Sequence, residues 1–178
     1  MHRLMLLRHA KTESDAPSGL DRDRRLDARG RKDAVMVGEW LAGQAALRPD
    51  LVLVSTAVRA RETWDLVRRS MTGTPEPPAA FLPDIYGAEP AHLLAIIRAA
   101  ATENPERLMI VGHNPGLHEI ALALIGSGGD EAGRRALDDN FPTSGLAVID
   151  FASGGWNDVS FRRGRLERFV SPRLLNEA

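Results

Sequence analysis

The chain has 178 residues, of which 43% are hydrophobic and 26% are charged, and its formal net charge is −1. This size and balance predict one globular domain over residues 1–178, with a core of its own. The near-neutral charge gives no strong field toward nucleic acid or an anionic membrane, so neither is expected as a partner. Cysteine is absent, which excludes disulfides, thiol chemistry and metal sites built on cysteine.

The first apolar run along the chain is short. It covers Leu4 to Leu7 and ends at Arg8, which is too short for the core of a signal peptide. No apolar run elsewhere approaches the length of a transmembrane helix. We therefore expect a cytoplasmic protein.

Strand-like and helix-like stretches alternate along the first half of the chain. Residues 4–7 predict a buried strand, and the apolar spacing after Asp27 predicts a helix that ends before Pro49. Residues 51–55 predict a second buried strand, and a second helix is expected over 58–71.

The same alternation continues in the second half. A short edge strand is expected at 81–82, a helix over 90–102 and a strong buried strand over 108–112. A further helix is expected over 117–125, and the glycines of 126–129 predict a loop that ends it.

Two final strands are expected over 145–151 and 158–162, joined at Ser153-Gly154-Gly155 by a turn that suits a hairpin. Strands that alternate with helices imply a three-layer α/β/α fold around a mostly parallel central sheet. The hairpin would then lie antiparallel at one edge of that sheet.

Three of the predicted strands lead into polar residues. The first ends in Arg8 and His9, the second ends in Ser55 and leads to Arg59, and the third runs into His113. The carboxyl ends of parallel strands meet at one edge of a sheet, where open α/β folds bind their ligands. If these strands are neighbours, two histidines and two arginines face each other in one pocket.

Such a pocket suits the transfer of a phosphoryl group to a histidine. An imidazole attacks phosphorus, while guanidinium groups grip phosphate oxygens and meet their charge without a metal. We therefore expect no metal and no cofactor.

Each of these residues also has an ordinary structural interpretation. His9 fits a hydrogen-bonded strand end, and Arg59 fits a solvated helix face. The segment His113-Asn114-Pro115 fits a strand-to-helix turn, with proline at the first helical position. Only the combined placement of the residues after strands favours the pocket.

Three short motifs resemble the signatures of the histidine phosphatase superfamily, in the expected order along the chain. They are Arg8-His9-Ala10, with alanine where the family usually has glycine, the segment 55–63, and Gly112-His113-Asn114-Pro115. Within this superfamily the chain resembles the small SixA-type phosphohistidine phosphatases. The shared features are the short length, Leu26-x-x-x-Gly30, Tyr86 and Pro142-Thr143. The resemblance implies a phosphoglycerate mutase-like fold.

The resemblance also implies the roles of the pocket residues. His9 would be phosphorylated transiently, while Arg8, Arg59 and His113 bind and stabilise the phosphoryl group. These four residues are the catalytic candidates, and Thr12 is a further candidate for binding phosphate.

The general acid has several candidates. Relatives that cleave phosphate esters use a carboxylate from the loop after the third strand, where this chain offers Asp84 and Glu89. Pro83 occupies the position that the family spacing gives to the acid, and Asp15 and Asp21 in the first polar loop are further candidates. An alkoxide leaves poorly without a proton, whereas the imidazole of phosphohistidine leaves in neutral form once its other nitrogen is protonated, at a pKa of about 6.5. The lack of a carboxylate at the expected general-acid position therefore favours a substrate with a nitrogen–phosphorus bond.

These observations predict a metal-independent phosphatase that forms a covalent phosphohistidine intermediate. Its substrate would be phosphohistidine in a partner protein, such as a histidine phosphotransfer domain. One alternative is a phosphomonoesterase for a small metabolite such as a sugar phosphate, and another is a catalytically silent phosphate-binding module. The mixed charges of residues 21–25 fit either a solvated loop or a rim that docks the phosphorylated partner.

Overall fold

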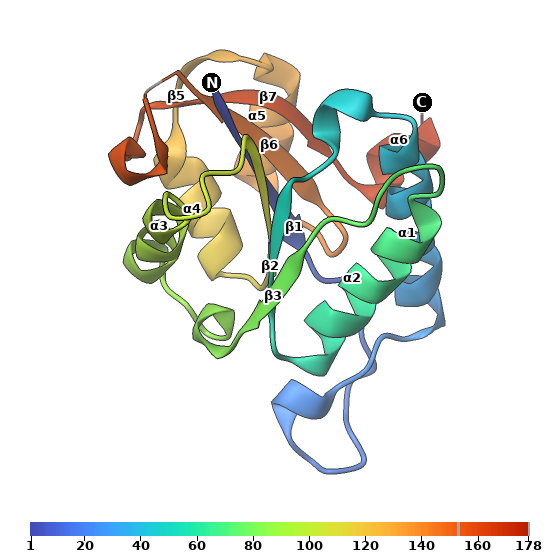
Figure 1. Ribbon diagram of the computed structural model, residues 1–178. Helices are drawn as coiled ribbons and strands as arrows, with labels where there is room; N and C mark the ends of the chain where they lie inside the picture. The colour runs from blue at the N-terminus through green and yellow to red at the C-terminus, as the bar shows by residue number, and fades with distance from the viewer. Residues whose placement is uncertain (153, 178) are drawn as a thin grey trace.

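The computed structural model describes residues 1–152 and 154–177, and it shows a central sheet between two layers of helices (Figure 1). The strands are β1 (His2–Arg8), β2 (Leu51–Ser55), β3 (Ala79–Leu82), β4 (Arg107–Gly112), β5 (Ile125–Gly129), β6 (Leu146–Phe151) and β7 (Gly164–Val170). The α-helices are α1 (Ala28–Ala42), α2 (Val58–Ser70), α3 (Pro90–Ala99), α4 (Gly116–Leu124), α5 (Glu131–Asp139) and α6 (Pro172–Glu177). Short 3₁₀ helices are η1 (Asp21–Asp23), η2 (Ala45–Leu47), η3 (Pro83–Ile85) and η4 (Trp156–Asp158). The predicted α/β/α class is confirmed.

The order of strands across the sheet is β3-β2-β4-β1-β6-β7-β5. Pairing is parallel between β3 and β2, β2 and β4, β4 and β1, and β7 and β5. It is antiparallel on both sides of β6. The three strands that the sequence predicts to carry the pocket, β2, β4 and β1, are therefore immediate neighbours.

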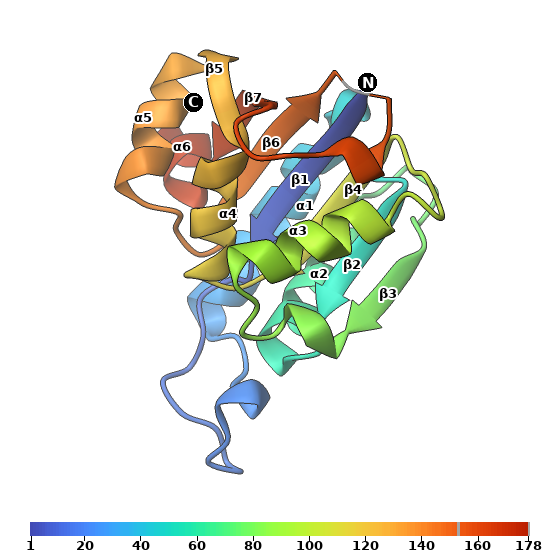
Figure 2. The same cartoon turned by 90° about the vertical axis from the view of Figure 1, so that its left-hand side faces the viewer.

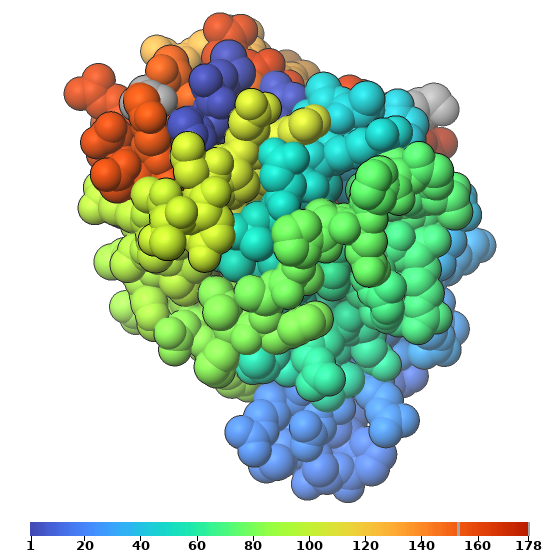
Figure 3. All heavy atoms as spheres, viewed as in Figure 1, coloured from blue at the N-terminus to red at the C-terminus, as the bar shows by residue number. Residues whose placement is uncertain are grey.

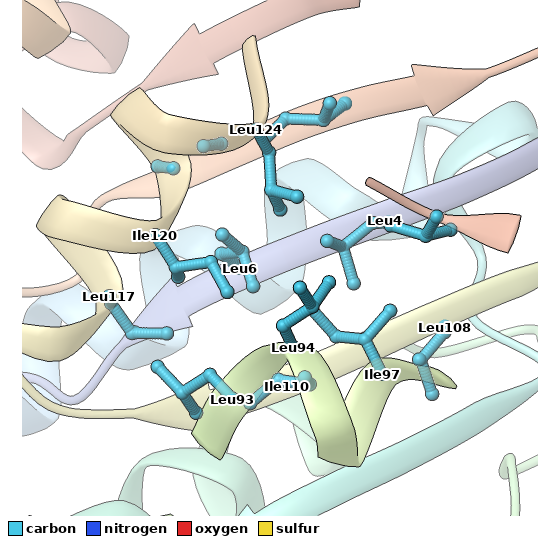
Figure 4. Packing of buried hydrophobic residues seen from close by; sticks show 14 of the residues in the cluster. Leu4, Leu6, Leu93, Leu94, Ile97, Leu108, Ile110, Leu117, Ile120 and Leu124 are labelled. Atoms are coloured by element: carbon cyan, nitrogen blue, oxygen red, sulfur yellow. The ribbon is translucent and has the colours of Figure 1, made fainter. Parts of the chain in front are cut away.

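The sheet is buried on both faces, as the alternation of side chains along β1 shows. Leu4 and Leu6 point into one hydrophobic cluster, which contains residues of α3 and α4. Met5 and Leu7 point into the other cluster, against α1 and α2. Figure 4 shows the first cluster closing around Leu6. Continuous apolar runs are expected for parallel strands that helices cover on both faces.

The C-terminal strands differ from the prediction. The strand expected over 158–162 is wrong, because Trp156 is fully buried and its indole N–H donates to the carbonyl of Pro105 at 2.6 Å. This anchor makes the segment a 3₁₀ turn against α3, and the chain enters the sheet only at Gly164. Ser153, in the predicted turn, lies outside the described residues.

The loop predicted at residues 126–129 is instead the end of an edge strand. β5 pairs parallel with β7, so the antiparallel β6–β7 pair lies one strand inside the edge. A glycine-rich strand has no alternating side chains from which a pattern can be recognised. Helix α5 is not among the predicted elements; Asp130 caps it by accepting a hydrogen bond from the Gly133 N–H.

None of the helices in the described residues is both long and apolar enough to cross a membrane.

Helices α1 and α2 pack directly against each other on one face of the sheet. Gly38 makes this approach possible, because a Cβ there would lie 2.5 Å from the carbonyl oxygen of Val67 and 2.6 Å from Cβ of Ser70. Backbone cannot move aside as the end of a flexible side chain can. The position therefore requires glycine, although glycine weakens a helix interior.

The variant Gly38→Ala should lower the free energy of unfolding by about 1–3 kcal/mol, the usual cost of overpacking. Equilibrium unfolding in urea measures this change. The control is Gly43→Ala, because a Cβ on Gly43 would lie 3.6 Å from its nearest neighbour and its φ is −87°. A Gly38→Ala protein that is as stable as the wild type would contradict the close approach.

Candidate active site

The parallel pairing of β1 with β4 brings the two histidines together. Arg8 is opposite Gly112 in the register, and the backbone N–H of His9 donates to the Gly112 carbonyl at 3.1 Å. The ring centroids of His9 and His113 are 5.2 Å apart. Arg59, in the first turn of α2, lies against the same space, and both arginines lower the pKa values of both histidines. The structure thus brings Arg8, His9, Arg59 and His113 together at one edge of the sheet.

His9 is held with a defined tautomer. Its Nδ1–H donates to the carbonyl of Ala10 at 2.8 Å, so Nε2 carries the lone pair. Thr63 fixes the backbone here, because its hydroxyl accepts from the Ala10 N–H at 2.9 Å and donates to the Arg59 carbonyl at 2.6 Å. Burial, with the neighbouring cations, lowers the pKa of His9 to about 3. The unprotonated ring is the form that a nucleophile requires.

His113 is also neutral, since burial and the charge of Arg59 lower its pKa to about 4. Its Nε2 lies 2.7 Å from the hydroxyl of Ser55, which is fully buried and accepts from the Ala57 N–H at 3.3 Å. Within the described residues, that hydroxyl has no acceptor other than His113 Nε2. We therefore assign the Ser55 hydroxyl as donor to Nε2, which leaves the proton of His113 on Nδ1.

The two arginines are held by their outer nitrogens. Arg8 Nη1 donates to the Phe141 carbonyl at 3.0 Å. Arg59 Nη1 donates to the backbone carbonyl of Asp21 at 2.9 Å, and Nη2 donates to its carboxylate at 3.0 Å. Both guanidiniums are thus anchored on the side away from Nε.

Three buried nitrogens of the pocket have no hydrogen-bond partner in the described part of the chain. They are Nε of Arg8, Nε of Arg59 and Nδ1 of His113. Leaving a buried donor unpaired costs roughly 1–3 kcal/mol, and more for a charged group. Such atoms are rare in folded proteins, and a catalytic role or a bound ion is among the reasons for them. Two cationic donors and one neutral donor around His9 suit a tetrahedral oxyanion.

The segment around Pro142 closes one side of the pocket. The Phe141 carbonyl accepts from Arg8 and also from the side-chain amide of Asn114 at 2.8 Å. The Ser144 N–H is shared between the carbonyls of Arg8 and His9, at 3.1 Å each. This segment therefore ties the end of β1 to the start of β6.

The two general-acid candidates from the loop after β3 lie in different places. Asp84 is exposed on η3. Glu89 lines a cavity of about 570 Å³ together with His113 and Asn114. Thr12 accepts a hydrogen bond from Arg24 at 2.8 Å, at the base of the polar loop. Of the two acids, Glu89 is the one that shares a cavity with a pocket histidine.

Some contributors could not be identified from the sequence. The Phe141 carbonyl has no side-chain signature, and the ion pair of Asp21 with Arg59 joins residues from different elements. Ser55 and Thr63 lie within the second motif, but only the structure shows that they hold His113 and the backbone next to His9.

Comparison with known proteins identifies the family. The family model of the histidine phosphatase superfamily (branch 1) matches residues 4–80. An uncharacterized protein of Mycobacterium tuberculosis is 38% identical over 169 residues, which cover 94% of this chain and all of that protein. The chain belongs to the histidine phosphatase superfamily, and this membership supports phosphatase activity.

The chain is also similar to solved structures. A structure from Agrobacterium tumefaciens, assigned as the phosphohistidine phosphatase SixA, is 36% identical with a TM-score of 0.78, covering 96% of this chain and 98% of that one. A mycobacterial glucosyl-3-phosphoglycerate phosphatase shares the fold at 18% identity with a TM-score of 0.65, covering 96% of this chain and 100% of that one. The predicted resemblance to SixA-type proteins is confirmed.

The low pKa values of the two histidines predict a dependence of stability on pH. The pKa is about 3 for His9 and about 4 for His113, below the value of about 6.5 in an unfolded chain. Between these values the unfolded chain binds protons that the folded chain does not. The free energy of unfolding should therefore fall as the pH drops from about 6.5 to about 3, by a few kcal/mol in all, with the part due to His113 complete near pH 4.

Urea unfolding at several pH values tests this dependence, with His113→Gln as the matched variant. Glutamine keeps a hydrogen-bonding group near Ser55 but does not titrate, so the pH slope of this variant should be shallower. The carboxylates titrate equally in both proteins and cancel in the comparison. Equal slopes would show that the fold does not hold His113 neutral.

Proposed function

We propose that the chain is a metal-independent phosphatase that removes phosphate from phosphohistidine in a partner protein, through a phosphorylated His9. The observation that carries this proposal is the set of unpaired buried nitrogens of Arg8, Arg59 and His113 beside the free Nε2 of His9. The 36% identity to a SixA structure supports the same substrate class.

The first step is an in-line displacement at phosphorus. The Nε2 lone pair of His9 forms the new N–P bond as the bond to the substrate imidazole breaks. The electron pair stays on that nitrogen, and because solvent has already protonated the other ring nitrogen, the group leaves as neutral imidazole. Arg8 and Arg59 meet the charge on the equatorial oxygens, and the Nδ1–H of His113 donates to one of them. A guanidinium stays charged throughout, so charge is stabilised without a metal.

The second step returns His9 to its starting state. A water molecule attacks the phosphorus of phospho-His9, the N–P bond breaks with its electron pair on Nε2, and inorganic phosphate leaves. The hydrogen bond from Nδ1 to the Ala10 carbonyl persists through both steps, so the ring keeps its orientation.

A phosphomonoesterase for a small metabolite is a second candidate. The position of Glu89 on a cavity shared with His113 favours it, because an ester substrate needs a proton donor there. The glucosyl-3-phosphoglycerate phosphatase shows that this fold accommodates such a substrate. A silent phosphate-binding module is a third candidate, and it predicts no covalent intermediate.

Rapid-quench labelling tests the covalent step. Wild-type protein mixed with a radiolabelled phosphorylated histidine phosphotransfer domain should acquire an acid-labile label. His9→Ala should acquire none, because no other described histidine has a free Nε2 in the pocket. The control His92→Ala changes an exposed histidine and should be labelled as the wild type is. Turnover without any label on the wild type would contradict the proposal.

The variant Glu89→Gln separates the two substrate classes. Turnover of the phosphohistidine domain should stay within about twofold of wild type, since its leaving imidazole needs little help from an acid. Any turnover of a sugar phosphate should fall by about 10²-fold or more, the usual contribution of a general acid. Asp84→Asn is the control and should change neither rate. A sugar phosphate turned over faster than the phosphohistidine domain would overturn the preference.

A further inference from the structure

The polar loop between β1 and α1 extends away from the body of the molecule, at the edge of the sheet where β1 ends (Figures 1 and 2). In the space-filling view it is the blue lobe at the bottom (Figure 3). The short helix η1 (Asp21–Asp23) lies in this loop, and it contacts α2. Asp21 is therefore the point at which the loop reaches the pocket.

The carboxylate of Asp21 accepts three charged or phenolic donors. Oδ2 accepts from Arg59 Nη2 at 3.0 Å and from the Tyr86 hydroxyl at 2.6 Å. Oδ1 accepts from Arg24 Nε at 2.9 Å. The backbone carbonyl of the same residue accepts from Arg59 Nη1 at 2.9 Å. One residue thus occupies the whole outer edge of the Arg59 guanidinium.

A guanidinium is planar and has two usable forks. The outer fork is made by Nη1 and Nη2, and the side fork by Nε and the second hydrogen of Nη2. Asp21 fills the outer fork of Arg59, whose side chain is 7% exposed. The side fork contains the buried, unpartnered Nε. Because the group is rigid, fixing the outer fork also fixes the direction of the side fork.

Asp21 also places Tyr86. The phenol ring of Tyr86 lies 5.5 Å from the His113 ring, edge to face, and 5.7 Å from the Arg59 guanidinium carbon. The carboxylate therefore organises two neighbours of the phosphoryl position. Hydrogen bonds from Tyr86, Arg24 and Arg59 hold its pKa at about 2, so it is ionised at neutral pH and does not serve as a proton donor.

We propose that Asp21 is a positioning residue for phosphoryl binding, which holds Arg59 so that its Nε side fork faces the phosphoryl group beside His9. This inference rests on the proposed function, because it assumes that the pocket binds phosphate. It replaces the role of general acid for which Asp21 is one of the sequence candidates. In the opposite role the carboxylate would compete with phosphate for Arg59. Removing its charge would then strengthen phosphate binding, whereas positioning predicts weaker binding.

Calorimetric titration with inorganic phosphate distinguishes these roles. Asp21→Asn should bind phosphate about tenfold more weakly than wild type, the size expected when one charge-assisted contact is lost. The matched control is Asp23→Asn, in the same short helix, where the carboxylate accepts from Ser18 at 2.7 Å and does not contact Arg59. It should bind as the wild type does. Unchanged or tighter binding by Asp21→Asn would overturn the proposal.

A double-mutant cycle with Arg59→Lys tests whether Asp21 acts through Arg59. Lysine keeps the positive charge but has no second fork to orient, so adding Asp21→Asn to Arg59→Lys should change phosphate affinity by less than about twofold. The same factor in both backgrounds would assign Asp21 a general structural effect and refute positioning. If the wild type neither binds phosphate nor accepts a phosphoryl group on His9, the proposed function fails instead.

Discussion

The hydrogen bond from the His9 N–H to the Gly112 carbonyl fixes the relation on which the pocket depends. It continues the parallel register of β1 and β4 by one residue beyond the pair of Arg8 and Gly112. The residues that follow the two strands, His9 and His113, are therefore neighbours. A slip of one residue would turn every side chain of β1 to the opposite face. Met5 and Leu6 pack in different clusters, so such a slip would require both hydrophobic clusters to repack. Packing far from the pocket thus determines where its histidines lie.

The pocket combines unprotonated histidines with unpaired cationic donors. Burial keeps the pKa of His9 low, although the Ala10 carbonyl favours the protonated ring. Nε of Arg8 and of Arg59 have no partner among the described residues, which costs stability that the surrounding core offsets. Asp21 moderates this arrangement, since it neutralises the outer side of Arg59 and leaves the inner side available.

Much of the fold and part of the pocket could be predicted from the sequence. The buried strands are continuous apolar runs, and the polar residues that follow them include Arg8, His9 and His113, with Arg59 in the helix after the second strand. The strand at 126–129 could not be predicted, because glycines have no side-chain pattern. The predicted strand at 158–162 fails because the Trp156 anchor to Pro105 is a tertiary contact. Asp21 and Phe141 reach the pocket only through folding. Their contacts with Arg59 and Arg8 join residues far apart in the chain, so local residue spacing does not predict them.

The supply of protons decides which leaving group this pocket can release. Neutral His113 donates a hydrogen bond through Nδ1. With a pKa of about 4 its ring is not protonated at neutral pH, so it does not act as a general acid. Asp21 is ionised, with a pKa of about 2. Glu89 is the general-acid candidate that lines a cavity together with His113. A phosphorylated imidazole accepts a proton from solvent on its other nitrogen near neutral pH. Its release therefore needs no general acid from the pocket.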